Sequence, residues 1–357
     1  MIKYLGSKRL LIPKIVEVTS LIPGVTTVID LFSGTSRVGH AFKKAGYQVL
    51  SNDHNAYAEV LARCYVQADA EDVVEDATKL IREFNQIKGS AGYFTDTYCI
   101  QSKFFQPHNG ERIDAIREAI KVRGLEPELE AVVLTSLMEA ADRVDSTVGL
   151  QMAYLKSWSK RSYNNLELRV PEVLPRSKHG KGRVYGLDVF EALPHLTGDV
   201  AYIDPPYNQH SYLGNYHIWE TLVRWDKPEV YGVAQKRVDV KDRKSVFNSK
   251  PQFGPAFERL LQNVNAPILI VSFSDEGYLS REEIENRLFS LDGGNTKIYV
   301  LENDYPRYVG AKIGGYNPQG EKVGKASHLR NKEFLYVVFR TSVKVELMEK
   351  LYYSEVT

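Results

Sequence analysis

The chain has 357 residues, of which 43% are hydrophobic and 25% charged, which is the composition of a globular protein with room for a large core and a second subdomain. Its net charge is only +1, so bulk charge gives no support for nucleic-acid binding, and any attraction for phosphate has to come from local clusters. We find neither a signal peptide nor an apolar stretch of the roughly 20 residues that a membrane span requires. Cys64 and Cys99 are far apart without metal-ligand spacing, which predicts buried free thiols and a reducing, cytoplasmic location.

The first elements along the chain form a predicted nucleotide-binding unit. The β-branched, apolar run over residues 25–32 predicts a buried parallel strand, which a turn at Ser33-Gly34-Thr35 and a helix to Lys44 or Ala45 follow, with Gly46 as the helix cap. Residues 47–51 predict a second strand and residues 55–68 a second helix. This order of elements is typical of the doubly wound α/β class.

The middle of the chain departs from that pattern. Ile113, Ile116 and Ile120 share one helical face, and the apolar positions over residues 129–141 fit a longer amphipathic helix. We therefore predict that residues 86–183 form a mainly helical insertion, and that the acidic run from Glu139 to Asp145 is a solvated face of the long helix. Strand patterns return afterwards, at residues 183–187, 200–203, 267–273, 297–301 and 334–339.

Two candidate binding motifs follow the first two predicted strands. The segment Asp30-Leu-Phe32-Ser-Gly34 places a glycine directly after a strand, where the backbone can approach a ligand closely, so Phe32 and Gly34 are candidates to line a pocket. The dinucleotide fingerprint Gly-x-Gly-x-x-Gly is absent, and a purely structural turn is the alternative. Asp53 ends the second strand, where its carboxylate can accept both hydroxyl hydrogens of a ribose, or can cap the next helix instead.

The most informative stretch is Asp204-Pro205-Pro206-Tyr207, directly after an apolar strand. A given tetrapeptide occurs by chance in only about one chain in several hundred. The prolines fix the backbone, so a carbonyl can point outward beside the Asp204 carboxylate and give two neighbouring acceptors. Two acceptors can hold both hydrogens of an aromatic amine and aim its lone pair at a methyl donor, while Tyr207 stacks on the base, a contact worth about 1–3 kcal/mol. The alternative is a rigid strand-to-loop turn.

These motifs and their order resemble the Dam-like adenine-specific DNA methyltransferases. The opening Lys3-Tyr4-Leu-Gly6-Ser-Lys8 is similar to the amino-terminal cofactor motif of that family, and Asp-Leu-Phe-Ser-Gly is similar to its glycine motif. The stretch from Pro205 through Asn-Tyr-His to Thr221 resembles the Fok-type branch in particular. The similarity runs in outline from residue 2 to about residue 339 and is loose over the insertion. Ser7 stands where Dam proteins often have Gly, and Tyr4 where they often have Trp.

The resemblance implies a Rossmann-like α/β fold with a seven-stranded sheet, S-adenosylmethionine as cofactor, S-adenosylhomocysteine as product, and no metal. It implies that the catalytic residues are Asp204, Pro205, Pro206 and Tyr207. It implies a catalytic domain over residues 1–85 and 184–345, with residues 86–183 recognising DNA. Asp188 is carried over as a residue near the adenine of the cofactor, although it could simply cap the next helix. The cofactor-binding residues that it implies are Tyr4, Gly6, Lys8, Asp30, Phe32, Gly34, Asp53, Asp188 and Asp204.

The function expected from this resemblance is methylation of the N6 amine of an adenine flipped out of double-stranded DNA, in restriction-modification or in protection of bacterial or phage DNA, with a cognate restriction endonuclease as a candidate partner. Three alternatives remain open. Methylation of the cytosine amine is disfavoured by Asp204, because those enzymes often carry Ser there. The other two are methylation of RNA adenine and a non-catalytic nucleic-acid-binding module that kept the fold.

Three locally basic stretches, residues 156–183, 236–250 and 307–332, are candidates for contacts with phosphate, and solvated loops are the alternative for each. The histidines at 108, 210 and 217 do not form a metal set, and we favour a structural role for His217. The candidate DNA-binding residues are Lys160, Arg161, Asn164, Arg243, Arg307 and Lys312.

Overall fold

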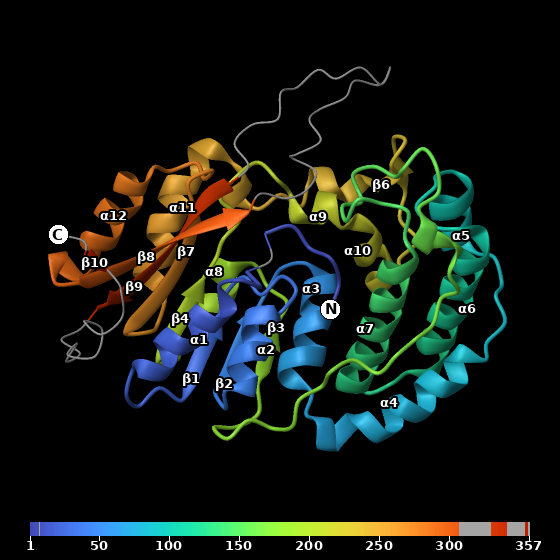
Figure 1. Ribbon diagram of the computed structural model, residues 1–357, viewed down its shortest axis with the longest axis horizontal. Coiled ribbons are helices and arrows are strands. Elements are labelled where there is room, and N and C mark those ends of the chain that lie inside the picture. Colours follow the sequence, from blue (N-terminus) through green and yellow to red (C-terminus); the bar gives the residue numbers. More distant parts are fainter. Residues whose placement is uncertain (7, 307–329, 341–353, 356–357) are drawn as a thin grey trace.

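The computed structural model describes residues 1–6, 8–306, 330–340 and 354–355. The main sheet is mixed and has the strand order β10-β8-β9-β7-β4-β1-β2-β3 (Figure 1), and β5 (Val230–Tyr231) pairs with β6 (Lys236–Arg237) in a separate two-stranded sheet. Five strands run parallel, and β9 and β8 are antiparallel to their neighbours. The seven expected strands are therefore present, and the two-residue β10 adds an edge. Their bounds are β1 Thr27–Asp30, β2 Gln48–Asn52, β3 Arg183–Tyr185, β4 Val200–Ile203, β7 Ile268–Ser274, β8 Lys297–Pro306, β9 Arg330–Phe339 and β10 Ser354–Glu355.

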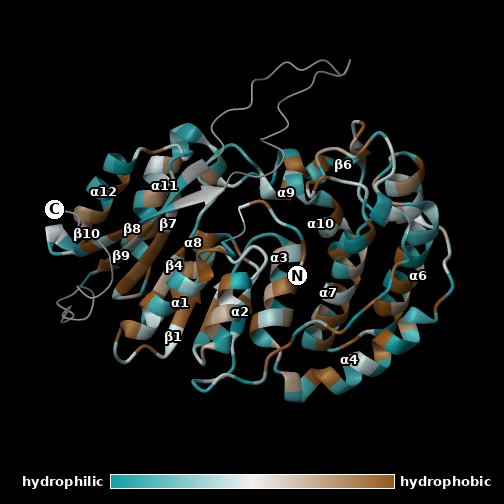
Figure 2. Ribbon diagram, viewed as in Figure 1, coloured by the Kyte–Doolittle hydropathy of each residue, from teal (hydrophilic) through white to brown (hydrophobic). Residues whose placement is uncertain are grey.

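Helices cover both faces of the sheet because alternate strand residues point to opposite sides. On one face, Val28 of β1 and Tyr202 of β4 pack against α1 (Ile12–Leu21) and α2 (Arg37–Lys44). On the other face, Ile29 and Ile203 pack against α8 (Val189–Ala192), α11 (Lys250–Asn263) and α12 (Arg281–Phe289). Both faces of the strands are buried, and their ribbons are correspondingly hydrophobic in Figure 2, whereas the covering helices show alternating stripes.

Residues 86–183, which we predicted to be a mainly helical insertion, contain several helices and share one hydrophobic cluster with the rest of the protein, and their status as a separate domain stays a prediction. The helices of this range are α5 (Tyr93–Thr95), a π-helix (Asp96–Ile100), α6 (Pro107–Arg123), α7 (Pro127–Val144) and a 3₁₀ turn (Lys160–Tyr163). They stand beside the sheet together with α4 in Figure 1. The cluster joins Leu137 of α7 to Leu61 of α3 and to Trp219 of α10, so the helices of residues 86–183 pack directly on helices that lie outside this range. The bounds of these partners are α3 Ala56–Ala62, α4 Ala70–Asn85 and α10 His217–Arg224.

One helix differs from the expected element, and the two cysteines agree with what was expected. The helix expected over residues 55–68 stops as α3 at Ala62 and continues as a π-helix over Arg63–Gln67. The two cysteines are buried free thiols, as expected. Within the described residues, no helix is both long and apolar enough to cross a membrane.

The acidic run on α7 is not solvated, which corrects our expectation. Asp142 and Asp145 are buried, and they hold the amino-terminal segment: the backbone N–H of Lys3 donates to Asp142 at 3.1 Å, and the Lys3 ammonium lies 3.3 Å from Asp145. The amino group of Met1 pairs with Glu139. The sequence pattern could not show this, because the partners are more than a hundred residues away along the chain. The consequence is that α7 docks the segment that carries Tyr4, Gly6 and Lys8.

Candidate active site

The carboxyl ends of β1, β2 and β4 open into one cavity of about 820 Å³. Strands β1 and β4 are neighbours, and the chain leaves them toward opposite edges of the sheet, so the cavity lies at the topological switch point where ligands of open α/β sheets bind. Eight of the nine predicted cofactor residues line it: Tyr4, Gly6, Lys8, Asp30, Phe32, Gly34, Asp53 and Asp204.

The turn after β1 is tied to the end of β2. Gly34 has φ +49°, in the left-handed region that favours glycine, and its N–H donates to Oδ2 of Asp53 at 2.9 Å. The other oxygen of Asp53 accepts from the N–H and the side-chain amide of Asn55 at 3.0 and 3.1 Å. A Cβ at position 34 would lie 3.3 Å from the ring of Tyr4, which is a tight contact, so the position favours glycine for its packing as well as for its backbone conformation.

The amino-terminal segment supplies an aromatic wall. Tyr4 stacks on Tyr212 and Tyr216, with ring centroids 5.2 and 4.5 Å apart, and its hydroxyl lies 3.0 Å from that of Tyr57. Burial raises the pKa of Tyr4 well above its usual value, so the hydroxyl stays neutral. Tyr212 belongs to α9 (Tyr212–Asn215), which follows the Asp-Pro-Pro-Tyr motif in the chain and lines the same cavity.

Asp204 sits at the end of β4 with a cation beside it. Its carboxylate lies 3.3 Å from the ammonium of Lys8, which also pairs with Glu333 of β9 at 2.9 Å. Burial raises the pKa of Asp204 to about 6; Lys8 opposes this shift and Glu333 adds to it. The pKa of Asp30 rises to about 7, chiefly by burial and then through the nearby charges of Asp204 and Asp53. Carboxylates with raised pKa values in a cleft are typical of functional sites.

The rest of the Asp-Pro-Pro-Tyr motif is divided between the cavity and the core. Pro206 lines the cavity, whereas Pro205 and Tyr207 do not. The ring of Tyr207 packs 5.0 Å from that of Phe273 and lies 5.5 Å from the Lys8 ammonium. The carbonyl of Tyr207 accepts from the N–H of Tyr278 at 2.9 Å. The motif is therefore held from β7 and from the loop that follows it.

Asp188 is the one predicted cofactor residue outside the cavity lining. It is the N-cap of α8, and its carboxylate accepts from the N–H of Phe190 at 3.0 Å. Asp188 therefore caps α8, which is the alternative role that the sequence allowed for it. Its proximity to the cofactor adenine stays a prediction.

Three cavity residues come from a segment to which the sequence assigned no cofactor role. Arg243, Ser245 and Asn248 belong to the connection between α10 and α11, residues 225–249, which we call the α10–α11 connection. Arg243 was a candidate for DNA contact; it lines the cavity, with its guanidinium 2.7 Å from Glu220 and 3.4 Å from Asp239. A residue pattern could not have placed this connection, because no regular helix or strand longer than a few residues organises it.

The other five candidate DNA-binding residues do not line the cavity or lie outside the described residues. Lys160 and Asn164 are exposed on the insertion. Arg161 is engaged within the protein, because its guanidinium binds the Asp145 carboxylate, the Asp145 carbonyl and the Thr147 carbonyl. Arg307 and Lys312 lie outside the described residues. Contact of these side chains with DNA stays a prediction.

His217 has a structural environment, as we favoured. Its Nε2 lies 3.0 Å from the carbonyl of Gln151, and burial lowers its pKa to about 3, so the ring is neutral. Among the residues that the structure describes, no group of three or more His, Cys, Asp or Glu side chains could hold a metal ion.

Comparison with known proteins decides the family. A family model described as D12 class N6 adenine-specific DNA methyltransferase matches residues 4–280, which include the glycine turn, Asp53 and the Asp-Pro-Pro-Tyr motif. The chain belongs to this family. The resemblance inferred from the motifs is thereby confirmed, and membership implies that S-adenosylmethionine is the cofactor.

The relatives of this chain include proteins named type II methyltransferases and modification methylases. Type II methyltransferase M.FokI of Planomicrobium okeanokoites is 34% identical over 306 residues, which are 81% of this chain and 47% of the relative. Modification methylase StsI of Streptococcus sanguinis is 32% identical over 309 residues, 82% of this chain and 47% of the relative. Type II methyltransferase M.NlaIII of Neisseria lactamica is 28% identical over 313 residues, 85% of this chain and 90% of the relative. The chain spans about half the length of the first two relatives.

The cavity fits the cofactor that the family implies. Gly34 leaves space beside Tyr4 that a Cβ would narrow, and Asp53 offers carboxylate oxygens at the site where a ribose is expected. Ser33 lines the cavity, and its hydroxyl has no protein partner among the described residues, so a polar group remains there for a ligand.

Proposed function

We propose that this protein transfers the methyl group of S-adenosylmethionine to the N6 amine of an adenine flipped out of double-stranded DNA, as the modification enzyme of a restriction-modification system or as a protector of bacterial or phage DNA. The observation that carries the proposal is that Asp204 lines the same cavity as Gly34 and Asp53. One cavity thus combines a cofactor cradle with an acceptor for an amine. A cognate restriction endonuclease is the partner that the names of the relatives suggest.

The cofactor, when bound, supplies an electrophilic methyl group. Asp53 would bind the ribose, and Tyr4, Phe32 and Gly34 would form the walls of its site. Asp204 would accept one hydrogen of the adenine amine and the carbonyl of Pro205 the other, so that the nitrogen lone pair faces the methyl group. As the nitrogen–carbon bond forms, the sulfur–carbon bond breaks, S-adenosylhomocysteine leaves as a neutral thioether, and the methylated amine loses one proton to solvent. Tyr207 would stack on the flipped base next to the cavity, since its ring is not part of the cavity lining, and this contact offsets part of the few kcal/mol needed to unstack the base. Rate enhancement comes mainly from this positioning.

The proposal is tested by Asp204→Asn. The variant keeps the shape of the side chain but loses the charge that holds the amine, so we expect methylation to fall by about 100- to 1000-fold, the range seen when one transition-state partner is removed. Binding of S-adenosylmethionine, measured by calorimetry, should persist. Methylation is measured as modified adenine in DNA by mass spectrometry.

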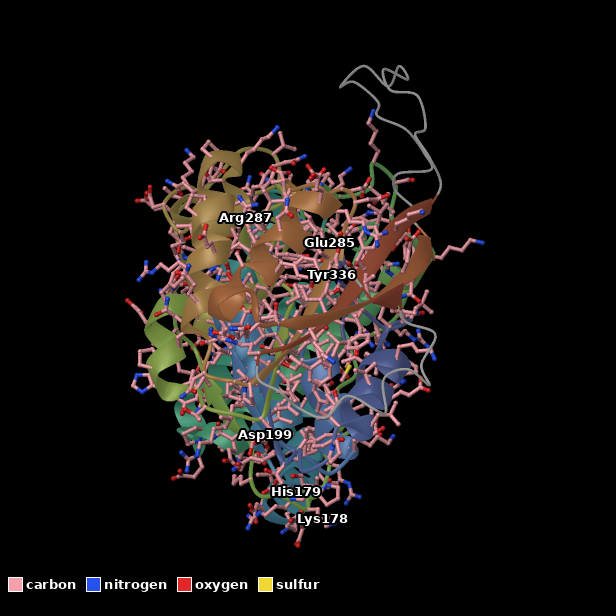
Figure 3. The ribbon with its side chains drawn as sticks, turned by 90° about the vertical axis from the view of Figure 1, so that its left-hand side faces the viewer. Lys178, His179, Asp199, Glu285, Arg287 and Tyr336 are labelled. Carbon is pink, nitrogen blue, oxygen red and sulfur yellow. The ribbon has the colours of Figure 1, made fainter. Side chains whose placement is uncertain are left out.

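Asp199→Asn is the matched control. Asp199 directly precedes β4, at the end of the strand opposite to Asp204, and its carboxylate accepts from the N–H groups of Thr26 and Thr27 at 2.8 and 2.9 Å. Figure 3 shows it near His179, at the lower end of the molecule in that view. An amide oxygen can accept the same bonds, so this variant should methylate DNA normally. Full activity of Asp204→Asn, or adenine methylation of RNA but not of DNA by the unmodified protein, would refute the proposal.

A further inference from the structure

A buried carboxylate contacts two residues of the proposed catalytic machinery from the antiparallel side of the sheet. Glu333 lies on β9, opposite Ser274 of β7, and is 7% exposed. Its Oε2 accepts from the Lys8 ammonium at 2.9 Å, and its Oε1 accepts from the Tyr207 hydroxyl at 3.4 Å. Nothing in the sequence motifs singled out this residue, because its partners are 325 and 126 positions away along the chain.

Lys8 is shared between two carboxylates. Its ammonium is 2.9 Å from Glu333 and 3.3 Å from Asp204, and the side chain is 6% exposed. Burial alone would lower the pKa of Lys8, but Asp204, Tyr207 and Glu333 together raise it well above its usual value, so the group is charged. The ammonium has three N–H donors and contacts both carboxylates, but it is closer to Glu333, to which it donates a hydrogen bond. The shorter distance to Glu333 means that Asp204 is the partner left less engaged.

Asp204 needs that freedom under the proposed function. A carboxylate that is closed in an ion pair offers fewer lone pairs to an incoming amine. The ring of Tyr207 must in addition keep a defined orientation to receive a base, and its hydroxyl has Glu333 as an acceptor. Glu333 contacts the groups behind both requirements, because it binds the Lys8 ammonium beside Asp204 and accepts from the Tyr207 hydroxyl.

We propose that Glu333 is a positioning residue for methyl transfer: it holds the Lys8 ammonium away from full contact with Asp204 and fixes the Tyr207 hydroxyl, which leaves Asp204 an oxygen for the adenine amine. This inference rests on the proposed function, because it assigns Glu333 a role only through Asp204 and Tyr207. Glu333 does not line the cavity, so it is not expected to touch the cofactor.

The pH dependence of the reaction gives a readout that a merely structural role would not move. Asp204 must be ionised to accept the amine, so the rate should fall as the pH drops through its pKa of about 6. The negative charge of Glu333 contributes to that raised pKa, and Lys8 opposes it. Without the charge at 333, Lys8 pairs with Asp204 alone, and both changes lower the pKa of Asp204. The other ionisable groups coupled to Asp204 are Asp30, Tyr202, Tyr207 and Tyr212.

The experiment compares Glu333→Gln, Glu333→Asp and the unmodified protein. The rate constant and KM for DNA are measured from about pH 5 to pH 9, and cofactor affinity is measured by calorimetry. We expect Glu333→Gln to bind S-adenosylmethionine within about threefold of the unmodified protein and to lose about 100-fold in rate constant, the cost of a misplaced reacting group. The acid limb of its rate profile should move to lower pH. The variant Glu333→Asp keeps a carboxylate on a shorter side chain, so we expect a smaller shift of the acid limb and a rate constant between those of Glu333→Gln and the unmodified protein. If Glu333→Gln does not fold, Glu333→Asp provides the test.

Glu302→Gln is the matched control. Glu302 lies on the neighbouring strand β8, opposite Phe334, and pairs at the surface with Arg281 at 3.1 Å and with Lys332. It should leave the rate and the acid limb unchanged. A Glu333→Gln protein with an unmoved acid limb would overturn the inference, whatever its rate. If the unmodified protein does not methylate adenine, the proposed function fails, and this inference fails with it.

Discussion

Two regions of the molecule meet at the same cavity by different physical routes. The motif edge, at the carboxyl ends of β1, β2 and β4, presents Asp30, Gly34, Asp53 and Asp204 within a few residues of a strand. The α10–α11 connection presents Arg243, Ser245 and Asn248 from a segment with only short strands and 3₁₀ turns. The ends of the strands determine the positions of the residues at the motif edge. The positions of the residues in the α10–α11 connection depend instead on contacts with other side chains.

Those contacts form a buried ionic network. Arg237, on the short strand β6 (Lys236–Arg237), is 1% exposed and binds Asp226 at 2.7 Å and Asp239 at 2.9 Å. Burial opposes ionisation of both carboxylates, but the hydrogen bonds from Arg237 prevail and lower the pKa of each below its usual value. Asp239 also contacts Arg243 in the cavity wall. The comparison teaches that one wall depends on backbone geometry and the other on a charge network outside the cavity.

The largest expected effect is on the network. Arg237→Gln removes a buried cation and leaves Asp226 and Asp239 without their main partner, and breaking a buried pair costs about 3 kcal/mol, at the low end of its range because water reaches both aspartates. Chemical denaturation should show this loss of stability, and calorimetry should show weaker cofactor binding. Lys236→Gln, whose ammonium contacts the sulfur of Met152, is the control. Equal stability of the two variants would show that the ion pairs of Arg237 do not stabilise the α10–α11 connection.

The next effect concerns the motif edge. Gly34→Ala should weaken binding of S-adenosylmethionine about tenfold, because a left-handed alanine costs about 1–2 kcal/mol and its Cβ would press on the ring of Tyr4. Gly124→Ala is the matched control: Gly124 has φ +55°, and a Cβ there would meet nothing within 4 Å. Calorimetry should find normal cofactor affinity in the control. If both variants bind the cofactor equally well, the turn does not form part of the cofactor site.

The smallest effect is expected within the connection itself. The side-chain amide of Asn248 donates to the carbonyls of Asn208 and His210, at 2.9 and 3.1 Å, and so clamps the loop after the Asp-Pro-Pro-Tyr motif. Asn248→Ala should lower the rate of DNA methylation about fivefold, the equivalent of roughly 1 kcal/mol for one hydrogen-bonding group. Asn263→Ala, which removes a similar bond to the Arg259 carbonyl at the end of α11, is the control. A normal rate in both variants would show that the clamp does not affect catalysis.

The sequence predicted those parts of the site that depend on neighbours in the chain. The seven principal strands and the cavity residues Asp30, Phe32, Gly34, Asp53 and Asp204 follow from apolar runs and from the residues that end them, since parallel strands bring their carboxyl ends to one edge. Tyr4, Gly6 and Lys8, which also line the cavity, were implied by the family resemblance alone. The prediction from sequence failed for the acidic run on α7, where Asp142 and Asp145 look like a solvated face until Lys3 is brought against them. It also did not foresee that Arg161 would be engaged by Asp145.

By itself, then, the sequence determined the α/β scaffold, the glycine turn and the position of Asp204 at the end of a strand, because each arises from spacings of a few residues. Only the tertiary structure decided that Lys8 would be shared by Asp204 and Glu333, and that the α10–α11 connection would close the cavity with Arg243 and Asn248. Such pairings join charges from remote parts of the chain. The strength of these ion pairs depends on burial and distance, and neither can be predicted from a short stretch of sequence.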